Sequence, residues 1–253
     1  MKNGRLLSSG KARNISNFAQ EILEKRKRKS ILLMAHQIVG YPDFETNYEM
    51  IRLFHECGVD LVELQLPFSE PIADGPLFLK ANQKALERGT TVKQCLDFAQ
   101  KVTRDFPISC IFMTYYNILL QYGVKRFVET ARSIGIRGLI VPDAFPEESD
   151  EYFVACKQQH VDSILMVTPY TPNNRIEYLA DKTEGLLYCV ARKGVTGSRT
   201  PFGDATTDFL LRCRHYSSTP IGVGFGIQHP DDVRYLVNKS DIAIVGSTLL
   251  NVL

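Results

Sequence analysis

The sequence lacks a predominant charge of one sign. Thirty basic residues stand against 28 acidic ones in 253 residues, a formal net charge of +2. A charge this balanced does not indicate nucleic acid as the main partner. The basic run over residues 25–29 fits the last turn of a helix, where cations complement the helix dipole. We therefore expect no nucleic-acid partner.

Long apolar runs and metal-type spacings are missing too. No apolar stretch approaches the roughly 18 residues that span a bilayer, and none follows the charged N-terminus before Ser30, as a signal peptide would require. The six cysteines form no Cys-x-x-Cys pair, which favours reduced thiols. The five histidines show no metal-ligand spacing. We expect a cytoplasmic chain with no membrane partner and no metal.

From Ser30 onward, short β-favouring apolar runs alternate with amphipathic stretches. The expected strands are Ile31–Gln37, Asp60–Leu66, Ile108–Met113, Gly138–Val141, Ser163–Val167, Leu186–Ala191, Pro220–Gly224 and Asp241–Val245. The expected helices are Asn47–Glu56, Val92–Arg104, Val124–Ile134, Glu147–Gln159, Arg175–Lys182, Thr207–His215 and Asp231–Val237. Eight strands buried on both faces and alternating with helices predict an α/β fold, a (β/α)8 TIM barrel, rather than an open doubly wound sheet.

No linker or shift in composition suggests a second domain, so we expect one domain over residues 1–253. Residues 1–29 are expected to hold a basic N-terminal helix, because Ile15, Phe18 and Ile22 recur at helical spacing behind a possible cap at Asn14 or Ser16. The barrel is expected over residues 30–253 and ends in a short helix.

Glu63 is the first candidate for chemistry. Alternation along its strand places Leu61, Glu63 and Gln65 on one face. If that face points inward, an unpaired carboxylate lies in an apolar interior, which costs on the order of several kcal/mol. Burial would raise its pKa toward the range useful for proton transfer. The alternatives are a Glu paired with a buried cation, or a register that turns it outward.

Asp74 lies in the loop that follows the same strand. Residues 67–76 contain three prolines and a glycine, which restrict the path of the loop and can aim a carboxylate at a ligand. Taken alone, these residues are typical of an ordinary turn with no role in function. Together with Glu63 it supplies two carboxylates in different environments, which can divide acid and base roles.

Three glycine-bearing segments follow predicted strands, Gly194–Gly197, Gly224–Gly226 and Gly246–Ser247. Glycine lets backbone N–H groups approach a ligand closely, and the loops after strands seven and eight commonly bind phosphate in these barrels. We expect a phosphorylated small molecule as ligand. Taken alone, these segments also permit another phosphate-binding barrel enzyme, acting on a phosphosugar or an aminoimidazole intermediate.

Five segments, taken together, closely resemble the tryptophan synthase alpha subunit family. They are Leu64–Pro76, Met113–Asn117, Gly138–Asp143, Gly194–Gly197 and Gly222–Gly226, and the resemblance runs from about Ile31 to the C-terminus. It implies a TIM barrel that cleaves indole-3-glycerol phosphate to indole and glyceraldehyde 3-phosphate in tryptophan biosynthesis. It also implies no cofactor in this chain, and a beta-subunit partner that carries pyridoxal phosphate, in an alpha2-beta2 tetramer.

The resemblance assigns roles to individual residues. Glu63 matches the proton-transfer carboxylate and Asp74 the carboxylate that pairs with the indole N–H. Tyr188 and Thr196 match supporting residues. The residues that match phosphate binders are Gly197, Gly226, Gly246 and Ser247, and those placed at the indole pocket are His36, Gln65, Tyr115 and Phe225.

Two of these positions depart from the family pattern. Gln65 stands where the family usually has glycine, and His36 where an apolar ring is expected. A polar side chain in an apolar slot loses contact and needs a partner. Two expectations follow, namely ordinary cleavage of the substrate, or a catalytically impaired alpha subunit that acts mainly as an allosteric activator of the beta subunit.

Overall fold

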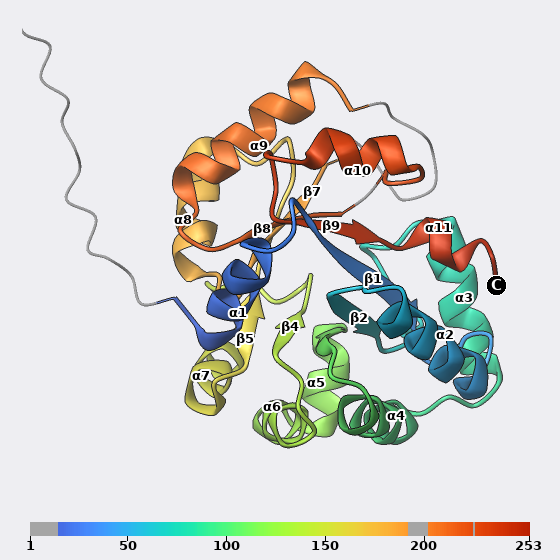
Figure 1. Cartoon of the computed structure of the whole chain (residues 1–253). Coiled ribbons are helices and arrows are strands. Elements are labelled where there is room, and N and C mark those ends of the chain that lie inside the picture. Colours follow the sequence, from blue (N-terminus) through green and yellow to red (C-terminus); the bar gives the residue numbers. More distant parts are fainter. Residues whose placement is uncertain (1–14, 192–201, 225) are drawn as a thin grey trace, which may run out of the picture.

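The computed structural model describes residues 15–191, 202–224 and 226–253, and in them parallel strands form a nearly closed barrel surrounded by helices (Figure 1). The strands are β1 Leu32–Ile38, β2 Leu61–Gln65, β3 Ser109–Met113, β4 Gly138–Ile140, β5 Asp162–Ile164, β6 Met166–Val167, β7 Leu187–Val190, β8 Ile221–Gly224 and β9 Ile242–Val245. Their order in the sheet is β5-β4-β3-β2-β1-β9-β8-β7-β6. The predicted barrel is confirmed.

The fifth expected strand is split into β5 and β6 at Leu165. Its first half pairs with β4 and its second half with β7. At the break, the backbone N–H of Leu165 donates to Thr183 Oγ1 at 2.9 Å, while its carbonyl accepts from the N–H of Tyr188 at 3.0 Å. The chain thus passes from a strand that pairs with β4 directly into a strand that pairs with β7. The two ends of the strand order are therefore joined by consecutive residues of the chain.

Helices cover the outside of the barrel. They are α1 Asn17–Arg26, α2 Phe44–Glu56, α3 Pro76–Glu87, α4 Val92–Asp105, α5 Tyr116–Tyr122, α6 Val124–Ser133, α7 Asp150–Gln159, α8 Asn173–Lys182, α9 Asp204–Tyr216, α10 Pro230–Leu236 and α11 Ser247–Leu250. The sequence predicted neither α3 nor α5. Helix α3 begins at Pro76, a residue suited to a first helical position, although it also ends a proline-rich loop.

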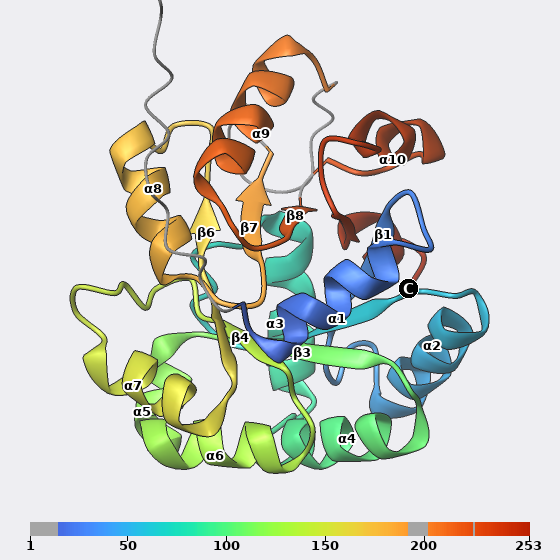
Figure 2. The same cartoon turned by 60° about the vertical axis from the view of Figure 1, so that its left-hand side comes forward.

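Alternate strand residues separate an inner core from an outer one. On β2, Leu61 packs inside the barrel, while Val62 and Leu64 pack between strands and helices. Helix α1 lies across one end of the barrel (Figure 2), where Phe18 and Ile22 join the inner core. The α1 helix therefore closes the end of the barrel opposite the carboxyl ends of the strands.

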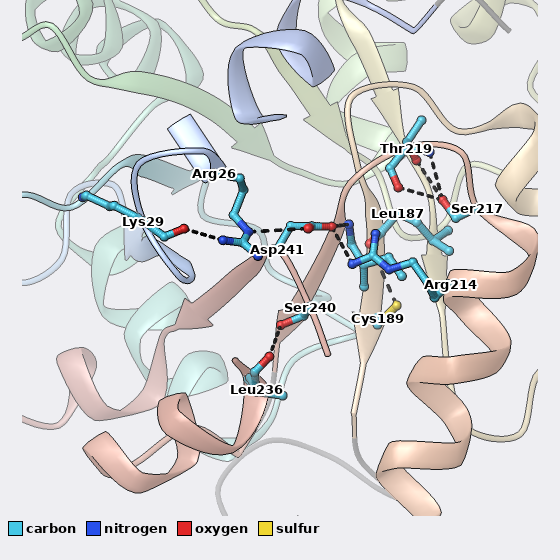
Figure 3. A network of polar contacts seen from close by, with 11 residues as sticks. Arg26, Lys29, Leu187, Cys189, Arg214, Ser217, Thr219, Leu236, Ser240 and Asp241 are labelled. Carbon is cyan, nitrogen blue, oxygen red and sulfur yellow. Dashed lines mark hydrogen bonds and ion pairs between the residues drawn. The ribbon is translucent and has the colours of Figure 1, made fainter. Parts of the chain in front are cut away.

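Asp241, just before β9, ties this closed end together (Figure 3). Its carboxylate accepts from the backbone N–H of Ile221 at 2.8 Å and from Arg214 at 2.8 Å, and it lies 3.5 Å from Arg26 Nε. In the same basic run, Lys29 forms an ion pair with Asp60 at 2.7 Å. These contacts hold the basic run against the barrel and give it a structural role.

Candidate active site

A cavity of about 60 Å³ opens at the carboxyl ends of the strands. Two carboxylates, an imidazole and a phenol line it together with apolar side chains. Its lining residues are His36, Glu63, Ala73, Asp74, Phe78, Met113, Ile140, Met166, Tyr188, Gly226, Ile227, Ile244, Gly246 and Ser247. This is the end of the barrel at which TIM-barrel enzymes place their chemistry.

Glu63 points into the barrel and is 2% exposed. The β1–β2 register places His36 directly beside it, and His36 Nδ1 lies 3.1 Å from Glu63 Oε1. The other oxygen, Oε2, is buried without a hydrogen-bond partner among the described residues, and so is His36 Nε2. The edge of the His36 ring also packs on Phe78, with ring centroids 4.9 Å apart. Glu63 is thus paired on one oxygen and free on the other.

Asp74 is held by two side-chain amides. Gln65 Nε2 donates to Asp74 Oδ2 at 2.6 Å, and Asn82 Nδ2 donates to the same oxygen at 3.3 Å. Asn82 also accepts from the backbone N–H of Phe68 at 3.0 Å, which ties the loop to α3. Burial raises the pKa of Asp74, while its Gln65 hydrogen bond and nearby His36 act in the opposite direction. Gln65 is fully buried behind Asp74.

The two predicted tyrosines take different places. Tyr188 on β7 lines the cavity, and its pKa is raised by burial and by the charges of Glu63 and Asp74, so it stays a neutral phenol. Tyr115 is fully buried and stacks on Phe68, with ring centroids 5.1 Å apart. Its hydroxyl accepts from the backbone N–H of Ala73 at 3.2 Å. Tyr115 therefore supports the Asp74 loop from behind.

Three of the four glycine and serine positions expected to bind phosphate lie in the described chain. Gly226, Gly246 and Ser247 all line the same cavity as Glu63 and Asp74. A Cβ added at Gly246 would lie 2.9 Å from Phe78 Cζ, so glycine lets α3 approach the last loop. Thr196, Gly197 and Phe225 lie outside the described residues.

This arrangement suits proton transfer on an apolar, planar ligand. Glu63 offers a buried oxygen, and Asp74, from the loop after β2, offers a carboxylate oriented by Gln65 and Asn82. Burial, the largest effect, lowers the pKa of His36, but the charge and hydrogen bond of Glu63 and the charge of Asp74 together raise it above its ordinary value. The cavity therefore contains acid, base and apolar surfaces together.

The sequence did not indicate Asn82 or Phe78. Both lie on α3, and the helical spacing of Phe78, Ala81, Asn82 and Ala85 is the signal that could have found them. In the described part of the chain, no group of three or more His, Cys, Asp or Glu side chains is arranged to hold a metal ion. Nor does any described helix combine the length and apolarity needed to cross a membrane.

Comparison with known proteins gives consistent matches. The family model described as tryptophan synthase alpha chain matches residues 22–253. The tryptophan synthase alpha chain of Desulforapulum autotrophicum is 48% identical over 231 residues, 91% of each chain, and that of Syntrophotalea carbinolica is 47% identical over 92% of each. A solved chain of Mycobacterium tuberculosis tryptophan synthase superposes with a TM-score of 0.88 at 28% identity, covering 95% of this chain and 92% of that one.

Proposed function

Because the chain belongs to the tryptophan synthase alpha chain family, we propose that the cavity described above is where it cleaves indole-3-glycerol phosphate, with Glu63 and Asp74 as the acting carboxylates. The family reaction is a retro-aldol cleavage to indole and glyceraldehyde 3-phosphate, and the chain is a carbon–carbon lyase of tryptophan biosynthesis. The observation that carries the residue assignment is that both carboxylates line one cavity at the carboxyl ends of the strands.

Glu63 is the proton-transfer group in this proposal. The reaction needs a proton delivered to C3 of the indole ring and a proton removed from the side-chain hydroxyl next to the bond that breaks. As the C3 side-chain bond breaks, its electron pair returns to the ring and the hydroxyl becomes the aldehyde of glyceraldehyde 3-phosphate. The unpaired Oε2 of Glu63, buried at the cavity wall, is suited to both transfers.

Asp74 accepts the indole N–H and stabilises the positive charge that the ring carries once C3 is protonated. Gln65 and Asn82 hold the carboxylate in place before the charge develops. A preorganised carboxylate in a partly buried site stabilises such a charge more strongly than water does. Tyr188, beside both carboxylates, and Thr196 are the supporting residues of the proposal.

The rest of the cavity binds the two ends of the substrate. Gly226, Gly246 and Ser247, with Gly197, are proposed to bind the phosphate. His36 and Phe225, with Gln65 and Tyr115 behind Asp74, are proposed to shape the indole side. The contacts of His36 and Gln65 support ordinary cleavage. Each side chain contacts one of the two carboxylates, His36 that of Glu63 and Gln65 that of Asp74. An impaired, purely activating subunit would instead require these two side chains to obstruct the indole pocket.

The test is indole release from indole-3-glycerol phosphate by the purified chain, with and without a beta subunit. We expect the wild type to release indole. Glu63→Gln should reduce turnover to about a thousandth of the wild-type rate or less, because the amide can neither take nor return a proton. Glu129→Gln, the same change on the exposed face of α6, should leave turnover unchanged. Indole production by Glu63→Gln at the wild-type rate would contradict the assignment.

A beta subunit that carries pyridoxal phosphate is the proposed partner, in an alpha2-beta2 assembly in the cytoplasm. Two observations support docking at the cavity end of the barrel. Ile72 is 76% exposed in the loop after β2, and Phe145 is 49% exposed in the loop after β4. Light scattering of a mixture with a beta subunit should give the mass of two copies of each chain; separate species would contradict the assembly.

A further inference from the structure

The contact between His36 and Glu63 is built into the barrel. The two residues are register partners on β1 and β2, and both side chains point inward. The side chains are 9% and 3% exposed, and Nδ1 of the imidazole lies 3.1 Å from Oε1 of the carboxylate. At this distance the imidazole N–H donates a hydrogen bond to an acceptor that carries charge, the stronger class of hydrogen bond.

The packing around His36 restricts its ring. The edge-on contact with Phe78 places the two ring planes 82° apart, with centroids 4.9 Å apart. A Cβ at Gly246 would lie 3.5 Å from the Cβ and 3.7 Å from the Cγ of His36, so the last loop also lies against this side chain. A ring confined in this way keeps Nδ1 on Glu63 and presents Nε2, which has no partner in the described chain, at the cavity wall.

The charged groups that face His36 can be named element by element. Glu63 comes from β2 and Asp74 from the loop that follows it, and both act on the imidazole charge. Tyr188 from β7 faces the same two carboxylates and stays neutral. The described residues of α3, β9 and α11 that line this part of the cavity are apolar, glycine or serine.

We propose that His36 is a positioning residue for Glu63: its imidazole holds Oε1 so that Oε2 faces the substrate, and the two groups together hold the proton that Oε2 delivers and later regains. This inference rests on the proposed function for the reaction that it serves. The family usually has an apolar ring at the position of His36, and the sequence alone suggested only that the histidine disturbs the indole pocket. In this proposal the histidine assists Glu63.

The proton count balances within the pair. The pair begins with one acidic proton in addition to the N–H of the neutral imidazole. The Nδ1–H donates to Oε1, and the carboxyl group of Glu63 presents the acidic proton on Oε2. Oε2 delivers this proton to C3 of the indole ring and then takes the proton of the substrate hydroxyl as the carbon–carbon bond breaks. The pair ends with one acidic proton, as it began. The form of the pair with this acidic proton is therefore the active one, and the form that has lost it cannot protonate C3.

Two substitutions separate the hydrogen bond from the proton. His36→Phe keeps a ring but removes both nitrogens, and His36→Asn keeps an N–H near the position of Nδ1 but cannot titrate. We expect kcat to fall about ten- to hundredfold in His36→Phe, the range for losing a hydrogen bond to a charged group, with KM changed less than threefold. His36→Asn should recover part of kcat. His55→Phe, on the exposed side of α2, is the matched control and should match wild type.

The pH dependence of kcat/KM distinguishes this proposal from a role of His36 in packing alone, because a packing residue would not change the pH at which activity is lost. The wild-type kcat/KM should fall on the alkaline side as the pair loses its proton, above the ordinary pKa of histidine, because Glu63 and Asp74 raise the pKa of His36. In both His36 variants this limb should move to a different pH, because Glu63 then holds the proton without the imidazole. Equal kcat and the same alkaline limb in His36→Phe would overturn the proposal.

An NMR titration of the imidazole tests the contact without any turnover. Glu63→Gln should lower the pKa of His36, whose resonance is identified by its absence in His36→Phe. An unchanged His36 titration in Glu63→Gln overturns the inference. If the wild type releases no indole while the His36 titration still depends on Glu63, the proposed function fails and the pairing stands.

Discussion

Replacing Gln65 by methionine tests whether this residue obstructs the cavity or serves it. Methionine is also unbranched and of similar length, so the packing behind Asp74 is retained while the donor to its Oδ2 is lost. The hydrogen bond is short, 2.6 Å, and its acceptor is a carboxylate. Asn82 remains as a donor to the same oxygen, at 3.3 Å.

The magnitude follows from that single contact. Loss of a hydrogen bond to a charged group costs about 1.5–3 kcal/mol. If Asp74 acts on charge that appears only in the transition state, the loss falls on kcat, a decrease of about ten- to hundredfold. KM should change little, because the ground-state indole N–H is neutral. Steady-state indole release over a range of substrate concentrations separates the two parameters.

A buried glutamine elsewhere in the barrel provides the control. Gln37 on β1 is 2% exposed and donates to the carbonyl of Asn47 at 3.2 Å, away from the cavity lining. Gln37→Met should cost about 1 kcal/mol in the free energy of unfolding and leave kcat unchanged. An equal or higher kcat in Gln65→Met would refute the reasoning, since Gln65 would then obstruct the site as its sequence position first suggested.

Two further predictions concern packing and pH. In Gly224→Ala, the new Cβ would clash with the hydroxyl of Tyr188, so we expect the free energy of unfolding, measured in denaturant, to fall by about 1–3 kcal/mol and turnover to decrease. Gly203→Ala, where the new Cβ meets no atom within 4 Å, should cost less. Burial raises the pKa of Asp162 from 3.8 to about 7, so its stabilising contribution is complete below about pH 4 and is lost as the pH rises through 7. The free energy of unfolding of the wild type relative to Asp162→Asn should therefore fall by up to about 4 kcal/mol between about pH 4 and pH 8, and a constant difference would count against a raised pKa.

The sequence supports the fold prediction most strongly where one rule decides the outcome. The period-two pattern of β2 predicted that Glu63 and Gln65 share a face with Leu61. The structure turns this face inward, where Leu61 packs in the inner core and Glu63 lines the cavity. The N-terminal helix was predicted with Ser16 as a possible cap, and the Ser16 hydroxyl accepts from the N–H of Ala19. Local rules suffice here, because side-chain direction and capping depend on neighbours in the chain.

Prediction was weaker where two rules compete in one segment. Three prolines and a glycine between β2 and α3 indicate a loop, and they concealed the helix that begins at Pro76. Asn82 was missed with that helix, although it lies against Asp74 and the backbone of Phe68. The fifth strand was predicted whole because no local signal marks Leu165, where the strand changes its neighbour.

The sequence by itself determined the eightfold alternation of strands and helices, the strand face that Glu63 shares with Leu61 and Gln65, and the family to which the motifs point. Only the tertiary structure decided what the two unusual residues contact. The β1–β2 register brings His36 to Glu63, and the loop after β2 folds back to bring Asp74 to Gln65. Registers and loop paths are set by packing among distant segments, so they leave no signature within a single stretch of sequence.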